Sequence, residues 1–427
     1  MHRFVSGLFI VFAVAGCLTP NAFAQQALTW QEVRERFITT NPLLQAARIG
    51  IDASRAQEVT AYLRPNPLFN ASMDQLHPFK GERDRYNVGT RDDALPVISL
   101  SYLIERMNKR ELRLESAKKG TTIAISQVAD EERNLLFALR SAFVQVLQQK
   151  AVLELAKENL AFYDQVLQIG GERVKAGDIA RIDQDRLELQ RTQFESDLQT
   201  ALVTLRTAKI QLLTLLNDRM PVEQFDVAGQ FDFSSQVLPL EDFRRIALDT
   251  RPDLKAAAQS IDQAMTNARL AEANASTDPI IGADYGQFVD IGQNPAPSYV
   301  GVSIGFPLRI FDRNQGERLR TKLEVERNQR LRNAAEALIY SDVDSAHAVL
   351  NNTLILLQPY KTKYLPQAVR VRDTVTFSYQ RGGASLLDFL QATRDYRSVQ
   401  LGYLTLVGSY LSAAAQLNLA VGREVVQ

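Results

Sequence analysis

Two stretches of this chain decide how the rest is interpreted: ALTWQEVRERFITTNPLLQAARIGID (27–52) and VLPLEDFRRIALDTRPDLKAAAQSID (237–262). They align at a constant offset of 210, with Thr40-Asn41-Pro42 opposite Thr250-Arg251-Pro252. Further along, KAGDIARIDQD from Lys175 pairs with QRGGASLLDFL from Gln380. Self-similarity over about 200 residues is too long for a solenoid repeat. We therefore predict an internally doubled fold, with a first structural repeat over 25–236 and a second over 237–427.

The composition excludes several classes of protein. Of 427 residues, 49 are basic and 49 acidic, so the net charge is zero and no nucleic-acid partner is expected. A hydrophobic content of 45% excludes a disordered chain. The mean hydropathy of −0.17, without a long apolar run beyond the N-terminus, argues against transmembrane helices. A membrane β-barrel stays possible, because its alternating strands leave little trace in bulk hydropathy.

The N-terminus predicts export from the cytoplasm. Met1-His2-Arg3 is followed by the apolar segment FVSGLFIVFAVAG, the pattern of a signal peptide. Two processing sites compete: removal of residues 1–24 after Ala22-Phe23-Ala24, or removal of 1–16 with lipidation of Cys17. Cys17 is the only cysteine, so no disulfide is expected within the chain.

Heptad spacing predicts very long helices. Apolar residues recur every seven positions along three segments, at Leu139, Val146, Leu153, Leu160 and Leu167, at Leu187, Phe194, Ala201, Ala208 and Leu215, and at Val343, Leu350, Leu357, Tyr364 and Val371. This period turns one apolar seam toward a neighbouring helix. A helix from about Glu105 to Ile169 would be about 100 Å long. Pro359 and Pro366 predict a bend in the second rod.

Each half also carries two β segments between its entry helix and its long helices. The four segments are NPLFNASMDQL, PVISLSYLI, DPIIGADYGQF and PSYVGVSIGF, and their residues alternate between apolar and small or polar. One interpretation is a small sheet packed on helices. The other is a set of membrane-spanning strands of about ten residues with aromatic residues near their ends. Four strands cannot close a channel, so several chains would share one barrel. The charged loop 77–93 suits the water-exposed side.

This combination resembles the TolC family of outer-membrane efflux channels over roughly residues 27–422. The resemblance rests on NPLLQAA and RPDLKAA, PLRIFDRNQG (307–316), and YQRGGASLLDFLQA (379–392). FDRNQG (311–316) and IERMNKR (104–110) are most similar to the CzcC-like heavy-metal efflux subgroup. Relatives often carry an acidic residue followed by Gly-Gly-Lys-Arg at the second of these, whereas this chain has Arg106-Met107-Asn108 before the basic pair.

The resemblance implies a mainly α protein with a membrane β-barrel portion. Three chains would form a twelve-stranded barrel and an α-helical tunnel that reaches into the periplasm from the outer membrane and its lipid. The partners would be a periplasmic adaptor and an inner-membrane RND-type pump, and the exported substrates metal cations or small toxic compounds.

The resemblance also implies roles for residues at the turns between long helices. The adaptor-contacting turns map to Gly177, Asp178, Gly382, Gly383, Ser385 and Leu386. Glycine at a tight turn has a second explanation, because it accepts positive φ. The channel constriction maps to Asp388 with Gln391, and to Asp183 in the first half, although a first-turn carboxylate can simply stabilise its helix. A ring of Asp388 carboxylates would attract cations, and the carboxylates would raise one another's pKa. Ala384 stands where some relatives have an arginine.

Nothing in the sequence predicts an enzyme, a cofactor or a bound metal. Only His77 and His347 lie beyond the signal segment, and no Cys/His cluster has metal-ligand spacing. There is no phosphate-binding glycine-rich loop. The main rival to a channel is a soluble periplasmic coiled-coil adaptor, although an adaptor normally has one helical hairpin where this chain has two.

Overall fold

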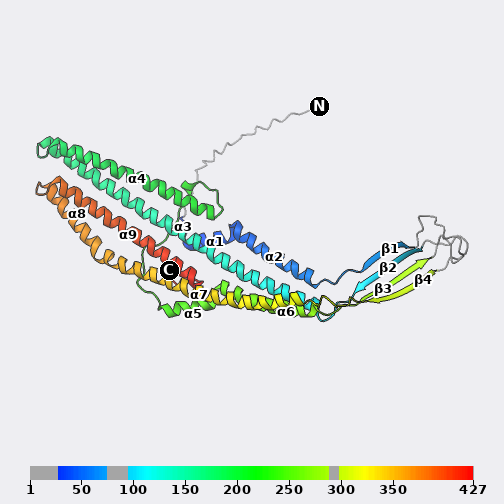
Figure 1. Cartoon of the computed structure of the whole chain (residues 1–427). Coiled ribbons are helices and arrows are strands. Elements are labelled where there is room, and N and C mark those ends of the chain that lie inside the picture. The colour runs from blue at the N-terminus through cyan, green and yellow to red at the C-terminus, as the bar shows by residue number, and fades with distance from the viewer. Residues whose placement is uncertain (1–26, 75–94, 288–297, 427) are drawn as a thin grey trace, which may run out of the picture.

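The computed structural model describes residues 27–74, 95–287 and 298–426. The signal segment 1–24 with Cys17, and the charged loop 77–93, lie outside these residues. Within them the chain forms a long helical rod with a small sheet at one end (Figure 1).

The first half is dominated by one helix that runs most of the length of the rod. Its elements are α1 (Trp30–Thr40), α2 (Pro42–Tyr62), β1 (Leu68–Asp74), β2 (Leu95–Leu103), α3 (Lys109–Ala176) and α4 (Arg181–Leu215). The 68 residues of α3 span about 100 Å. The long helix starts later than expected because Met107 and Asn108 take positive φ angles of 58° and 55°. Glycine adopts this conformation most readily, and Met107 and Asn108 hold it without being glycine.

The second half has the same order of elements. They are α5 (Leu240–Thr250), α6 (Pro252–Asn274), β3 (Ile280–Gln287), β4 (Ser298–Gly305), α7 (Gln315–Pro359), α8 (Leu365–Gln380) and α9 (Leu386–Val421). Asn314 precedes α7 with a φ of 59°, as Asn108 precedes α3. The Thr40 hydroxyl donates to Leu216 O at 2.8 Å, and the Thr250 hydroxyl to Val421 O at 2.6 Å. The two halves therefore share their junctions as well as their helices.

The second long rod is interrupted where proline was expected to disturb it. α7 ends at Pro359, a π-helical turn covers Tyr360–Tyr364, and α8 continues from Leu365 with Pro366 in its first turn. Proline lacks a backbone N–H, so the regular ladder of hydrogen bonds cannot pass through it. The π-helical turn joins α7 to α8, and the two helices together follow a curved path beside α9 (Figure 1).

The four described strands form one antiparallel sheet in the order β1-β2-β3-β4. Every residue of β1 is exposed, and so is every residue of β4 except Gly301. A sheet packed on helices would bury one face. The sheet instead extends beyond the helices (Figure 1), which rules out the small core sheet as an interpretation.

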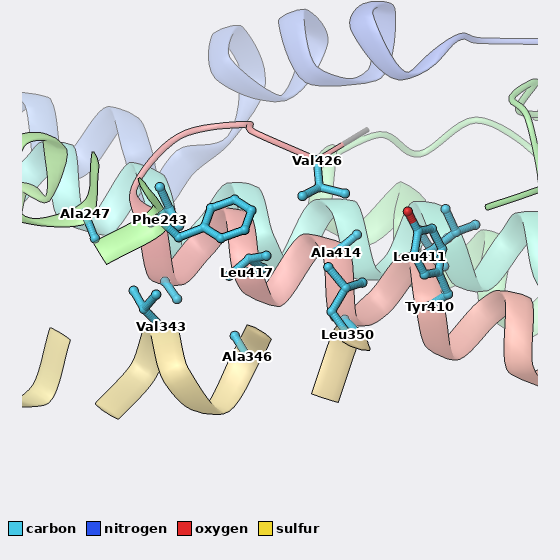
Figure 2. Close-up of a cluster of buried hydrophobic side chains, with 14 of the residues drawn as sticks. Phe243, Ala247, Val343, Ala346, Leu350, Tyr410, Leu411, Ala414, Leu417 and Val426 are labelled. Atoms are coloured by element: carbon cyan, nitrogen blue, oxygen red, sulfur yellow. The ribbon is translucent and has the colours of Figure 1, made fainter. Parts of the chain in front are cut away.

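The core lies between the helices. The largest buried cluster joins α5, α7 and α9 and includes Phe243, Leu350 and Leu417 (Figure 2). Of the described helices, α9 alone is long and apolar enough by composition to cross a membrane, yet 56% of its most apolar window is buried among the other helices. Packing within the chain therefore accounts for its apolar character.

The linker between the halves is held by charge. Asp226 lies 2.7 Å from Lys150 of α3 and 3.1 Å from Lys209 of α4. Burial would raise the pKa of Asp226, but hydrogen bonds from the two lysines outweigh it and lower that pKa. The ionised carboxylate therefore fastens the linker to both helices.

Candidate functional site

Two helix-to-helix turns lie at the end of the rod opposite the sheet (Figure 1). Gly177 ends α3 with a φ of 81°, and Gly382 follows α8 with a φ of 77°. After Gly177, the Asp178 N–H donates to Arg173 O at 2.9 Å, which closes the last turn of the helix. A Cβ on Gly177 would meet no atom within 4 Å, so the backbone conformation alone calls for glycine there.

Gly383 has a different reason to be small. Its N–H donates to Ser378 O at 2.8 Å, and a Cβ would lie 3.0 Å from the Ser378 hydroxyl. The residues predicted to contact an adaptor are mostly exposed, namely Gly177, Asp178, Gly382, Gly383 and Ser385, while Leu386 is partly buried against the aromatic cluster at this end.

Arg173 connects the two turns. Its Nη1 donates to Tyr379 O at 2.7 Å, and its guanidinium lies 5.4 Å from the centre of the Tyr379 ring. Arg173 belongs to α3 and Tyr379 to α8, so one side chain joins the ends of the two helical hairpins. No pattern in the sequence indicates this contact, because 206 positions separate Arg173 from Tyr379 and only Tyr379 belongs to one of the motifs quoted above.

An aromatic cluster lies directly behind the turns. Tyr379 stacks on Phe389 with ring centres 5.0 Å apart, and Tyr163 packs on Phe194 at 4.7 Å. All four rings are buried, and they come from α8, α9, α3 and α4. The two hairpins are therefore packed together at their tips. Of these residues only Phe194 stands in a heptad series that the sequence revealed.

Asp388 forms a capping box with Ser385 at the start of α9. The Asp388 carboxylate accepts the Ser385 hydroxyl at 2.7 Å and the Ser385 N–H at 3.2 Å. These hydrogen bonds lower the pKa of Asp388. A ring of like charges, as expected from the sequence, would push the pKa the other way. Asp388 is exposed, which leaves its charge available to the solvent.

The other two residues predicted for the constriction have local partners. Asp183 stands in the first turn of α4, 3.6 Å from Arg186. Asp183 also acts on Tyr379 near the second turn. Burial is the main cause of the raised pKa of Tyr379; the charge of Arg173 lowers this pKa, and the charge of Asp183 raises it. Gln391 donates to Asp395 at 2.8 Å and makes no hydrogen bond to Asp388 among the described residues.

Two exposed apolar residues at the turns escaped the sequence analysis. Ile182 is 57% exposed and Leu387 is 74% exposed. Each is the second residue of its helix, α4 or α9, so they hold equivalent places in the two halves. Large apolar side chains in water at the end of a rod are candidates for a protein contact.

At the other end, the two faces of the sheet differ sharply. On one face, a central row of residues across the four strands is polar or small. The two neighbouring rows point to the opposite face and are apolar. The polar row is Asn70, Ser99, Asp284 and Gly301; the apolar rows are Phe69, Leu100, Ala283 and Val302, and Ala71, Ile98, Tyr285 and Val300. A Cβ on Gly301 would lie 2.4 Å from the Asp284 carboxylate, so the glycine leaves room for that charge.

The described residues contain no group of three or more His, Cys, Asp or Glu side chains that could hold a metal ion. His347 packs against Phe243, with ring centres 5.9 Å apart.

Comparison with known proteins bears on both ends of the molecule. Residues 244–423 match the family model described as outer membrane efflux protein. A curated relative, the cobalt-zinc-cadmium resistance protein CzcC of Cupriavidus metallidurans, is 23% identical over 381 residues, which cover 89% of this chain and 86% of CzcC.

Solved structures share the fold. The outer membrane channel MtrE of Neisseria gonorrhoeae in its open state superposes with a TM-score of 0.71 at 18% identity, over 93% of this chain and 89% of MtrE. CusC gives a TM-score of 0.75 at 16% identity, over 92% of each chain. VceC of Vibrio cholerae gives 0.72 at 14% identity, over 92% of this chain and 96% of VceC.

Proposed function

Because the chain belongs to the outer membrane efflux protein family, we propose that it is the outer-membrane channel subunit of a tripartite efflux system. In this proposal three chains form a passive exit duct, with a twelve-stranded barrel in the outer membrane and a helical tunnel in the periplasm. An RND-type pump of the inner membrane and a periplasmic adaptor deliver the substrates. The doubled chain then acts as one protomer.

The observation that carries the proposal is an unpaired surface on each half. The first half contacts the second through elements whose counterparts in the other half have no such partner within the described chain. β2 of the first half pairs with β3 of the second. The equivalent pair, β4 with β1, is absent from the described sheet, in which β1 and β4 are the two edges. Unpaired strand edges in a membrane are costly, because no water satisfies their backbone groups. A second copy can supply the missing partner for each edge.

The helices repeat this asymmetry. α3 packs along α6 and α9, whereas among the described residues α7 makes no comparable contact with α2, and neither does α8 with α4. α2 leaves Ile49 and Val59 exposed, and α4 leaves Leu189 and Val203 exposed. A contact between unlike surfaces of successive copies closes into a ring when the rotation allows it. Sheet and helices therefore support the same ring of copies.

The two-faced sheet fits the membrane part of the proposal. Its apolar rows suit lipid, and the row that contains Asp284 suits a water-filled lumen. Four strands are too few to enclose a channel, so the barrel needs strands from several chains.

A disulfide cross-link tests the ring directly. Ser116 of α3 donates to Asn267 of α6 at 2.6 Å. Asn108 before α3 corresponds to Asn314 before α7, so Ser116 corresponds to Lys322. Pro252 of α6 corresponds to Pro42 of α2, so Asn267 corresponds to Gln57. In the ring, Lys322 should therefore lie opposite Gln57 of the next copy. Cysteines at Gln57 and Lys322 should give a covalent trimer on a non-reducing gel.

The matched control is a cysteine pair at Ser116 and Asn267, which should cross-link within one chain and leave the gel at monomer size. Each single-cysteine variant controls for Cys17. Fractionation adds an independent measurement, since the proposal expects extraction from the outer membrane by detergent only, as a heat-sensitive trimer. A soluble monomer released by osmotic shock would instead support the periplasmic adaptor.

For the substrate we propose metal cations, because CzcC is named for cobalt, zinc and cadmium resistance. Carboxylates also lie at both ends of the molecule, Asp284 in the sheet and Asp388 beside the second turn. The cations would pass without a dedicated high-affinity site. A deletion strain should lose resistance to these metals, and recover it with the wild-type gene. Loss of resistance to dyes and drugs alone would assign small organic compounds instead.

For the adaptor we propose contact at the turns, with Asp178, Gly382 and Ser385 at the surface and the exposed Leu387 and Ile182 beside them. Leu387→Asp should reduce adaptor capture from membranes without changing trimer yield. Capture equal to that of the wild type would remove these turns from the adaptor interface.

A further inference from the structure

A cavity of about 1060 Å³ lies near the middle of the rod, away from both the turns and the sheet. Its walls come from segments far apart in the sequence: the start of α1, the middle of α3, residues 228–234 of the linker and the end of α9. Leu411 and Val426, which border it, are labelled in Figure 2. The volume is that of a site for a small organic molecule.

The acidic residues of this pocket are already engaged. Glu132 lies 3.7 Å from Arg48, and Asp232 lies 2.8 Å from Lys361. Glu424 accepts a hydrogen bond from Trp30 Nε1 at 3.1 Å. Glu132 and Asp232 are therefore already paired with cations, and Glu424 holds one neutral hydrogen-bond donor.

The arginines are in the opposite situation. Arg133 pairs with Asp130 at 2.6 Å, but Arg34, Arg140 and Arg423 have no hydrogen bond or ion pair with any residue that the structure describes. Nε of Arg34 is buried without an acceptor. A guanidinium carries five N–H donors in a fixed plane, so the half-buried Arg34 and Arg140 present donors without a protein acceptor, and the exposed Arg423 adds a third positive charge.

Arg140 is the most constrained of the three. Its guanidinium lies over the Trp30 ring at 4.5 Å and near the Phe143 ring at 5.8 Å from their centres. Burial lowers its pKa, and the charge of Glu424 only partly offsets this. Arg140 therefore has aromatic contacts and a carboxylate charge nearby, but no direct ion pair among the described residues, and an anion bound beside it would stabilise its charge further.

The rest of the wall is apolar. Leu136, Phe137 and Phe233 line the pocket beside the arginines. A ligand that carried only charge would leave this surface wet, whereas a ligand with an apolar body would cover it.

We propose that this pocket binds an organic carboxylate with an aromatic or aliphatic body, with the carboxylate held by Arg140 and Arg34 and the body packed on the apolar wall. The lining of this site includes no residue of the turns or of the sheet. In this proposal the protein binds an organic carboxylate, in addition to the substrates that pass through the proposed duct.

Isothermal titration calorimetry of the full-length protein in a nonionic detergent tests the proposal, with naphthalene-2-carboxylate as the probe. We expect saturable binding of one probe per chain, weaker at high salt because the attraction is screened. The neutral analogue naphthalene-2-methanol should bind at least about tenfold more weakly, since it cannot pair with a guanidinium. Detergent without protein gives the background heat.

Arg140→Gln and Arg34→Gln should each weaken binding of the carboxylate by about tenfold or more, and leave binding of the neutral analogue unchanged. Arg245→Gln is the matched control, because Arg245 is exposed on α5 and pairs with Asp242 outside the pocket. Equal trimer yield for the three variants shows that they fold. The proposal is overturned if the two probes bind alike, or if both pocket variants keep the affinity of Arg245→Gln.

Discussion

A lysine at Val302 tests the orientation of the sheet. Val302 lies in the middle of β4, opposite Ala283 on the apolar face, and is 82% exposed within the chain. If that face meets lipid, Val302→Lys places an ammonium in hydrocarbon at a cost of about 2–4 kcal/mol per chain. This corresponds to a loss of roughly 30- to 800-fold in the ratio of folded to unfolded chains. We expect little heat-modifiable trimer in the outer membrane, and a lower urea midpoint for protein refolded into lipid vesicles.

The neighbouring residue provides the control. Ser303 points to the opposite face, in line with Gly282 of β3. Ser303→Lys should therefore keep its charge in water and assemble nearly as well as the wild type. The reasoning fails if Val302→Lys assembles normally, or if the two lysine variants are equally damaging, because either result would mean that the two faces meet the same solvent.

Three further predictions follow from the described contacts. Gly177→Ala should lower the free energy of unfolding by about 1–2 kcal/mol per chain, because Gly177 has a left-handed backbone. Gly171→Ala is the control: Gly171 lies inside α3 with its nearest neighbour at 4.0 Å, so alanine should raise the free energy of unfolding by about 0.5–1 kcal/mol. Urea unfolding followed by circular dichroism measures both changes, and equal changes would contradict a special backbone requirement at Gly177. The lowered pKa of Asp226 contributes stability above the unfolded pKa of about 3.9, and this is lost as the pH falls through the folded pKa. Thermal midpoints should therefore fall more steeply in acid for the wild type than for Asp226→Asn, and parallel curves would mean that the ion pairs contribute nothing. Asp388→Ala should reduce block by divalent cations in planar-bilayer recordings, and an unchanged current would remove this carboxylate from the constriction.

Much of the fold could be predicted because it is repetitive. Heptad seams give the long helices, and residues of those seams such as Leu139, Leu187 and Leu350 are fully buried. Alternation located all four strands to within a few residues. The starts of α3 and α7 were harder to predict, because positive φ at Met107 has no signal in a residue type that rarely adopts it.

The candidate site was less predictable, because its contacts join residues distant in sequence. Arg173 meets Tyr379 across 206 positions, and no local pattern encodes such a pair. The capping box is a different case. Ser385 and Asp388 stand three residues apart before an apolar helix, which is the pattern of an N-terminal cap. The resemblance assigns Asp388 only a constriction charge, and the structure adds Ser385 as the hydrogen-bond partner of its carboxylate.

That capping box joins the charge at the tip of the rod to the end of a helix. Since Ser385 holds the carboxylate of Asp388 in its ionised form, the negative charge persists in surroundings acidic enough to neutralise an ordinary aspartate. The same two hydrogen bonds also fasten the first turn of α9. Charge and helix end therefore fail together at low pH, and Asp388→Asn, which keeps an acceptor for Ser385, separates the two effects where Asp388→Ala cannot.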